Sequence, residues 1–205
     1  MPQKPDFSFE NKHTGAICGI DEVGRGPLAG PVVAAAVVIR RETMPQDILD
    51  QLNDSKKLTA KKREYLFSKI HEFADVSIAA CSVDEIDEIN ILQASLRAMA
   101  KAYKGLGIIP AVALVDGNQK PKLSCTIETI VKGDSRSLSI AAASIVAKHY
   151  RDNLMIQIAN DFPHYGWETN AGYGTAHHLE ALEKHGVTIH HRRSFEPVAR
   201  RLKQI

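Results

Sequence analysis

Hydrophobic and polar residues along the chain fall into patterns that predict both strands and helices. Short apolar runs, bounded by turn residues, predict strands at 16–21, 31–39, 75–81, 111–115 and 126–131. Apolar residues that recur every three or four positions predict helices at 61–73, 91–106, 138–160 and 175–185. The order β-β-α-β-α-β-β-α indicates a mixed α/β sheet with helices packed on it.

The run 31–39 is almost continuous in Val and Ala, which predicts a strand buried on both faces. A Gly- and Pro-rich segment, 23–30, precedes it and predicts a hairpin or a bulged loop. Gly24-x-Gly26-x-x-Ala29 formally matches the dinucleotide-binding fingerprint. That fingerprint has to open a helix, whereas here a strand pattern follows, so we exclude a dinucleotide site.

The chain has 205 residues, enough for one domain with a substantial core. We expect a flexible leader at 1–15, a core at 16–160 and a C-terminal extension at 161–205. The polar start carries no secretory signal, and the longest apolar run is about half a membrane span. The sequence therefore predicts a soluble cytoplasmic protein with no membrane partner.

The cysteines and the C-terminal histidines both raise the question of a zinc site. Cys18, Cys81 and Cys125 are widely spaced, which favours buried thiols in a reducing compartment over disulfides or zinc ligands. The histidines near the C-terminus lack a cysteine partner and a matching ligand spacing. We expect surface or duplex-facing roles for them: His177, His178, His185, His190 and His191.

Charge excludes a protein that holds nucleic acid by bulk attraction. Twenty-six Lys and Arg residues against 24 Asp and Glu leave a net charge of +2. The segment 171–205 is more basic, with six Lys or Arg residues and three acidic ones. If the partner is a polyanion, a few placed cations must recognise it.

Acidic residues end or follow three of the predicted strands, at Asp21-Glu22, Asp116 and Asp134. Strand ends of an α/β sheet form the crevice in which ligands bind. Each acid alone is equally compatible with a turn, but the set together favours a centre for Mg²⁺ or Mn²⁺. Two such ions roughly 4 Å apart would support phosphodiester hydrolysis by water, without a protein nucleophile.

Two further groups of residues are candidates for nucleic-acid contact. The glycines of Gly24-Arg25-Gly26 allow positive φ angles and close backbone approach, and Arg25 adds a donor for phosphate or sugar. Ser144, Lys148 and Arg151 are spaced to share one helix face. That face is equally compatible with a stripe that tracks DNA and with a solvated edge.

Seven segments of the chain resemble motifs of the bacterial ribonuclease HII family. They run in family order and span nearly the whole chain. They are GIDEVGRGPLAGP (19–31), DSKKL (54–58), VDGN (115–118), KGD (132–134), IAAASIVAK (140–148), GYGT (172–175) and HHRRSF (190–195). The first and the fifth are highly specific.

The resemblance implies a ribonuclease H-like fold, with a five-stranded mixed sheet flanked by helices and a small C-terminal helical extension. It implies an endonuclease that hydrolyses the RNA strand of RNA–DNA hybrids and cuts 5′ of single ribonucleotides embedded in duplex DNA. The implied cofactors are two divalent ions, Mg²⁺ or Mn²⁺. We expect the protein to be a monomer. We also expect products with 5′-phosphate and 3′-hydroxyl ends, because the strand ends carry carboxylates. Cleavage with the 2′-hydroxyl as nucleophile would instead require a general base and acid, most often histidines.

The resemblance also implies roles for single residues. Asp21, Glu22, Asp116 and Asp134 would bind the metals. Gly24, Arg25 and Gly26 would contact the 2′-hydroxyl and flanking phosphates, and Tyr173 would pack on the sugar at the RNA–DNA junction. We expect phosphate contacts at Lys56, Lys57, Ser144, Lys148, Arg192 and Arg193, although Arg192 and Arg193 also suit a docked tail.

Some of the sequence is open to less specific interpretations. Asp152 lies one helix away from the acidic set, and we expect it to pair with a neighbouring base. One alternative is a hybrid nuclease of the same fold with another junction preference. A non-enzymatic duplex-binding module is the alternative from a different class. Four carboxylates facing phosphate speak against that module.

Overall fold

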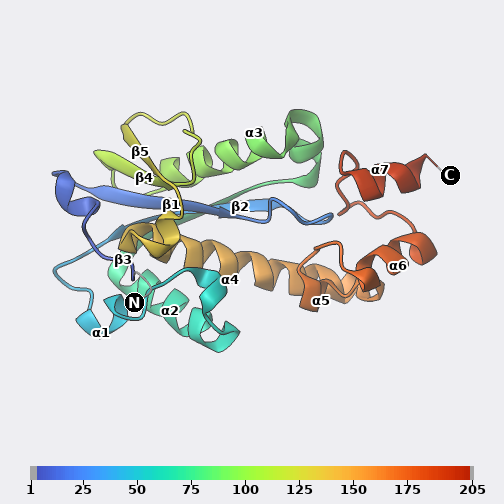
Figure 1. The fold of residues 1–205 in the computed structure, drawn as a ribbon, viewed down its shortest axis with the longest axis horizontal. Helices are drawn as coiled ribbons and strands as arrows, with labels where there is room; N and C mark the ends of the chain where they lie inside the picture. Colours follow the sequence, from blue (N-terminus) through green and yellow to red (C-terminus); the bar gives the residue numbers. More distant parts are fainter. Residues whose placement is uncertain (1–3, 204–205) are drawn as a thin grey trace.

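The computed structural model describes residues 4–203, and it confirms a five-stranded mixed sheet flanked by helices (Figure 1). The strands lie in the order β3-β2-β1-β4-β5. β1 pairs antiparallel with β2, as does β2 with β3, whereas β1–β4 and β4–β5 are parallel. The strands are β1 (Ile17–Val23), β2 (Val32–Ile39), β3 (Ala74–Cys81), β4 (Val112–Asp116) and β5 (Thr126–Ile130).

Helices cover both faces of the sheet, and a group of short helices lies beyond one end of it (Figure 1). The α-helices are α1 (Gln46–Leu49), α2 (Ala60–Phe73), α3 (Val83–Lys104), α4 (Leu138–Asp161), α5 (Trp167–Asn170), α6 (Ala176–His185) and α7 (Glu196–Leu202). Four 3-10 turns are η1 (Glu10–Lys12), η2 (Ser55–Lys57), η3 (Gly133–Ser135) and η4 (Pro163–Tyr165). The described helices include none that is long and apolar enough to cross a membrane.

Two hydrophobic layers hold the sheet between the helices. Every residue of β2 is buried, because alternate side chains face α4 on one side and α3 on the other. Val33, Ala35 and Val37 pack with α2 and α4, whereas Ala34 and Ala36 pack with α3. This confirms that the Val/Ala run is a strand buried on both faces.

The C-terminal helical extension is fastened to the loop that joins β1 to β2. Leu28 N–H donates to the carbonyl of Gly172 at 2.8 Å, and Arg192 N–H donates to the carbonyl of Leu28 at 2.8 Å. Ala29 and His191 form an isolated antiparallel bridge. The β1–β2 loop is therefore held from both sides by residues far away in the sequence.

The structure differs from the sequence prediction at the N-terminal segment. Residues 1–3 lie outside the described residues, but 4–15 are not a loose leader. Glu10 is buried, and its carboxylate accepts hydrogen bonds from the Ser137 hydroxyl at 2.7 Å and the Ser139 N–H at 2.9 Å. This segment is thus bound to the start of α4.

The helix predicted at 91–106 begins earlier than expected. Ser82 and Glu85 form a reciprocal capping box that starts α3 at Val83. The helix is interrupted at Asn90, whose φ of 66° is left-handed. The apolar periodicity that predicted the helix begins only after this kink, at residue 91. The helical turns at 83–90 were therefore not predicted. All three cysteines are free thiols, as predicted, with Cys18 and Cys81 buried.

Candidate active site

The four predicted carboxylates come together in one cavity of about 420 Å³. Asp21 and Glu22 lie in β1, Asp116 ends β4, and Asp134 lies in η3 after β5. The parallel register pairs Ile20 with Val115, so Asp21 and Asp116 follow at the next position of adjacent strands. Because β1, β4 and β5 are adjacent and parallel, the acids lie together at the C-terminal ends of these strands.

Most of the other predicted site residues line the same cavity. The β1–β2 loop contributes three residues, η2 contributes one, α4 contributes two and the loop before α6 contributes one. They are Gly24, Arg25, Gly26, Lys56, Ser144, Lys148 and Tyr173. The cavity is thus acidic at the strand ends and basic at its rim.

Asp21 is the deepest of the acids, with 7% of its surface exposed. Burial raises its pKa well above the ordinary value, and the charges of Glu22, Asp116 and Asp134 raise it further. The side chain of Ser144 lowers the pKa of Asp21 and so acts in the opposite direction. A buried carboxylate among like charges is an unfavourable arrangement unless a cation or a proton compensates it.

Two other acids also bind protons more readily than usual. Burial raises the pKa of Glu22, although Arg25 lowers it through an ion pair at 3.2 Å. Burial and the charges of Asp54 and Asp116 raise the pKa of Asp134 to about 6. The site therefore concentrates negative charge that its own cations do not balance.

These carboxylates fit a divalent-metal site by their chemistry, because hard oxygen ligands and uncompensated negative charge both favour Mg²⁺ or Mn²⁺. Among residues 4–203, however, no three His, Cys, Asp or Glu side chains form a ready-made ligand group. Mg²⁺ is usually held by one or two carboxylates, water and substrate phosphate, not by a closed protein cage.

The β1–β2 loop reaches the cavity by an unusual backbone path. Gly24 has a φ of 92°, which disfavours residues with a side chain. A Cβ at this position would also lie 2.2 Å from Nε of Arg151. Glycine at position 24 is therefore required both by backbone conformation and by the close approach of α4.

Comparison with known proteins identifies the family of this chain. The family model for ribonuclease HII matches residues 18–198. A ribonuclease HII of Paramagnetospirillum magneticum is 55% identical over 195 residues, covering 95% of this chain and 97% of that protein. One from Ruegeria pomeroyi is 57% identical over 206 residues, covering 98% and 86%. This chain belongs to the ribonuclease HII family.

Solved structures of other ribonucleases share the fold. Ribonuclease H2 from Pyrococcus horikoshii superimposes with a TM-score of 0.80 at 28% identity, covering 93% of this chain and 98% of that one. A ribonuclease HIII (Bst-RNase HIII), solved in complex with Mn²⁺, superimposes with a TM-score of 0.72 at 18% identity. That alignment covers 92% of this chain and 70% of that one. Family membership makes the chain a ribonuclease H enzyme, an endonuclease for RNA–DNA hybrids.

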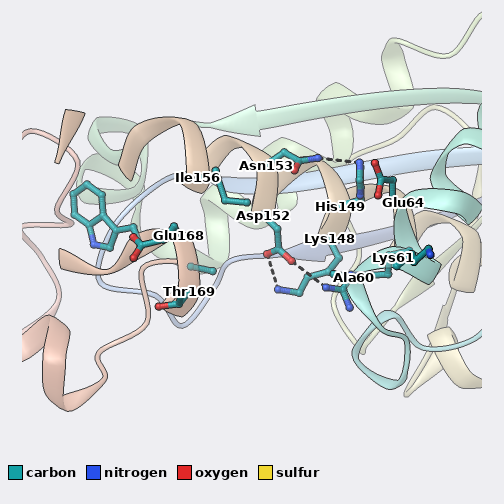
Figure 2. A pocket seen from close by; sticks show the side chains of 13 residues that line it. Ala60, Lys61, Glu64, Lys148, His149, Asp152, Asn153, Ile156, Glu168 and Thr169 are labelled. Atoms are coloured by element: carbon teal, nitrogen blue, oxygen red, sulfur yellow. Dashed lines mark hydrogen bonds and ion pairs between the residues drawn. The ribbon is translucent and has the colours of Figure 1, made fainter. Parts of the chain in front are cut away.

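The predicted stripe on α4 is divided between different roles. Lys148 pairs with Asp152 at 2.6 Å, and Asp152 also pairs with Arg63 at 3.4 Å, which confirms the structural pairing predicted for Asp152. Figure 2 shows these contacts in a neighbouring cavity of about 740 Å³. Arg151 is fully buried and donates to main-chain carbonyls, so it cannot track DNA.

Three predicted cations do not line the cavity that holds the four carboxylates. Lys57 and Arg193 are exposed outside it. Arg192 is a correction, because its side chain is fully buried and its guanidinium donates to the carbonyls of Gly24, Arg25 and Gly30. In this position it cannot contact a phosphate.

The histidine prediction also needs correction. His177 and His185 are exposed as expected, but His178 and His191 are buried against Trp167.

Sequence reasoning did not single out Ser55, which lines the cavity that holds the four carboxylates. The Ser55 hydroxyl lies 2.9 Å from that of Ser144. Its only sequence signal was its place between an acid and two lysines.

Proposed function

We propose that the enzyme cuts 5′ of single ribonucleotides in duplex DNA as well as within RNA–DNA hybrids. One observation carries the proposal. The acidic set, the 24–26 loop and Tyr173 face one cavity, so one site can receive both the scissile phosphate and the neighbouring 2′-hydroxyl. That hydroxyl is the group by which a protein tells RNA from DNA.

The four carboxylates, Asp21, Glu22, Asp116 and Asp134, would hold the metal ions. Two bound Mg²⁺ or Mn²⁺ ions supply an activated water and stabilisation of the leaving oxygen. Among the described residues that line the cavity there is no histidine, so the 2′-hydroxyl has no imidazole base to activate it. Water attack then leaves 5′-phosphate and 3′-hydroxyl ends.

The rim residues would position the duplex. Arg25 and Lys56 are exposed at the cavity and suit the phosphates on either side of the cut, with Lys148 and Ser144 at its α4 side. The ring of Tyr173 is 44% exposed and lies beside the loop, since a Cβ on Gly26 would be 3.4 Å from it. It is therefore available to pack on a sugar.

The surrounding surface would extend this contact along the duplex. We assign Lys57, Arg193 and the C-terminal extension 161–205 to the flanking phosphates, in a protein that acts as a monomer. Free cysteines fit a cytoplasmic enzyme. Removal of ribonucleotides from DNA during replication and repair is the role that such cutting would serve.

A cleavage assay tests the proposal. Three duplexes of one sequence are compared, with no ribonucleotide, one ribonucleotide or a full RNA strand, each with Mg²⁺, Mn²⁺ or a chelator. We expect metal-dependent cutting 5′ of the lone ribonucleotide and within the hybrid, with 5′-phosphate products. Cutting of the hybrid alone would favour a nuclease with another junction preference, and metal-independent binding without cutting would favour a duplex-binding module. Rising salt should weaken binding.

A further inference from the structure

The side chain of Arg192 is hydrogen-bonded to the main chain of the 24–26 loop. It is fully buried. Its Nη1 donates to the carbonyl of Arg25 at 2.9 Å, its Nη2 to that of Gly24 at 2.5 Å, and its Nε and Nη2 to that of Gly30 at 3.0 and 2.8 Å. A single planar guanidinium therefore fixes three peptide groups of one loop.

No acid neutralises this arginine within residues 4–203, where none of the ion pairs includes it. The positive charge of Arg151 acts on Arg192, and Arg151 is also fully buried and bonds to the carbonyls of Ala29, Pro31 and Ala171. Burial and the charge of Arg151 lower the pKa of Arg192 to about 9. Burying two cations without a carboxylate partner is costly, and hydrogen bonds to main-chain carbonyls are what offset that cost here.

The direction of the carbonyls determines the direction of the loop's N–H groups. In a trans peptide the C=O and the following N–H point in opposite directions, and the described chain has no cis peptide. Because the carbonyls of Gly24 and Arg25 point at Arg192, the N–H groups of Arg25 and Gly26 point away from it. Both residues line the catalytic cavity, and neither N–H donates to another backbone group in the described chain.

We propose that Arg192 is a positioning residue for ribonucleotide recognition. Its guanidinium turns the N–H groups of Arg25 and Gly26 toward the cavity, where they can donate to the 2′-hydroxyl and the adjacent phosphate. This inference rests on the proposed function. Lysine cannot replace it, since an ammonium group offers no planar set of donors for three carbonyls.

The positioning role of Arg192 is tested by measuring duplex binding under conditions that prevent cleavage. Wild type and Arg192→Lys are titrated, in Ca²⁺ or chelator, with a duplex carrying one ribonucleotide and with the all-DNA duplex of the same sequence. The measured quantity is the ratio of the two Kd values. We expect Arg192→Lys to reduce this preference about tenfold, which is the loss of about 1.4 kcal/mol of hydrogen bonding, with little change in all-DNA affinity.

Arg151→Lys is the matched control, because Arg151 is equally buried but bonds to carbonyls outside 24–26. Both variants should melt at lower temperature, whereas only Arg192→Lys should lose ribonucleotide preference. An equal loss in both variants, or none in Arg192→Lys, would overturn the positioning role. If wild type itself shows no preference, the proposed function fails instead.

A second measurement uses only the wild-type protein, in case Arg192→Lys does not fold. Amide ¹⁵N–¹H signals of Arg25 and Gly26 are followed on addition of each duplex. Both should shift more with the ribonucleotide duplex than with the all-DNA duplex, while the amide of Gly30, whose N–H is bonded to the His190 carbonyl at 2.9 Å, should not. Identical shifts with the two duplexes would contradict the proposal.

Discussion

Gly19 of β1 lies against the main chain of Ser139 at the start of α4. A Cβ on Gly19 would be 2.0 Å from the carbonyl carbon of Ser139. This absence of a side chain lets α4 lie directly on β1, with the buried small residues Ala141 to Ala143 continuing the contact. The same approach brings Ser144 over Asp21, so the helix–strand contact sets the depth of the acidic site.

Gly19→Ala should therefore disturb the fold and the site together. The new methyl group meets backbone atoms, which cannot rotate away, so α4 must move from β1. We expect a loss of about 3 kcal/mol or more in the free energy of unfolding and a marked fall in cleavage. Urea denaturation and the hybrid cleavage assay measure the two effects.

Gly107→Ala is the matched control, since its Cβ would lie 3.5 Å from Oδ1 of Asp75, an ordinary contact. We expect this variant to change the unfolding free energy by less than about 1 kcal/mol. Equal destabilisation by the two substitutions would show that the β1–α4 approach is not the determining contact.

Asp134→Asn should separate stability from activity. Asp134 is partly buried near Asp54 and Asp116, and these surroundings raise its pKa to about 6. Removing its charge relieves repulsion in the metal-free protein, so we expect a gain of about 1–2 kcal/mol at pH 7.5, less than the full pKa shift implies. Cleavage should be lost, because a proposed metal ligand is missing.

Thermal melting in chelator measures the stability effect, with Glu42→Gln, an exposed acid, as the control for loss of one charge. The control should melt within about 1 °C of wild type. Full cleavage by Asp134→Asn would exclude Asp134 from the metal site. Lower stability than wild type in chelator would show that the carboxylate is not repelled in the folded state.

Tyr173→Ala should affect the two classes of substrate unequally. The Tyr173 ring is exposed beside the 24–26 loop, where it can pack on the sugar at the RNA–DNA junction. A lone ribonucleotide offers one junction, whereas a long hybrid offers many sites without one. We expect about a tenfold greater loss of kcat/KM on the single ribonucleotide, with Tyr173→Phe close to wild type. An equal loss on both substrates would contradict junction sensing.

Much of this site could be predicted from the sequence because its signals are local. An apolar strand followed directly by an acid and a glycine marks Asp116-Gly117, and the Gly- and Pro-rich segment marks the β1–β2 loop. Each of these features lies within a few residues of the side chain that it positions.

The supporting residues could not be predicted in the same way. Arg192 bonds to the carbonyl of Gly24, 168 positions earlier in the chain, and no local pattern records such a partner. His178 and His191 lie in a polar segment, and histidine is a residue type of intermediate burial, so nothing local indicates that these two are buried. They are buried because each finds hydrogen-bond partners in the C-terminal extension, which only the folded structure shows.

These two histidines form a neutral buried chain of hydrogen bonds. His191 Nδ1 accepts from the N–H of Thr188 at 3.0 Å, so its proton lies on Nε2, 3.1 Å from Nε2 of His178. The indole N–H of Trp167 also lies 3.1 Å from His178 Nε2, so the two N–H donors share the single lone pair of that nitrogen. The remaining proton, on Nδ1, is donated to the carbonyl of Tyr173 at 2.9 Å. Protonation of either ring would break this chain beside Tyr173.

The stability of the enzyme should therefore depend on these histidines in acid. Burial lowers the pKa of His178, and burial with the charges of His178 and His190 lowers that of His191 to about 3. Between pH 6.5 and about 3 the unfolded chain binds a proton at position 191 that the folded chain does not, so folding weakens as pH falls. The slope contributed by His191 is at most about 1.4 kcal/mol per pH unit.

Variants at position 191 are needed to isolate the contribution of His191 to the pH dependence of stability. Asp134 changes the unfolding free energy with pH in the opposite direction. Its raised pKa makes the folded chain bind a proton first, which adds stability as pH falls from about 6. We expect His191→Gln to be less stable than wild type at pH 7.5 but to lose less of its unfolding free energy between pH 6.5 and 4.5. The exposed His177→Gln should keep the wild-type slope. Parallel pH profiles for wild type and His191→Gln would show that His191 does not titrate differently on folding.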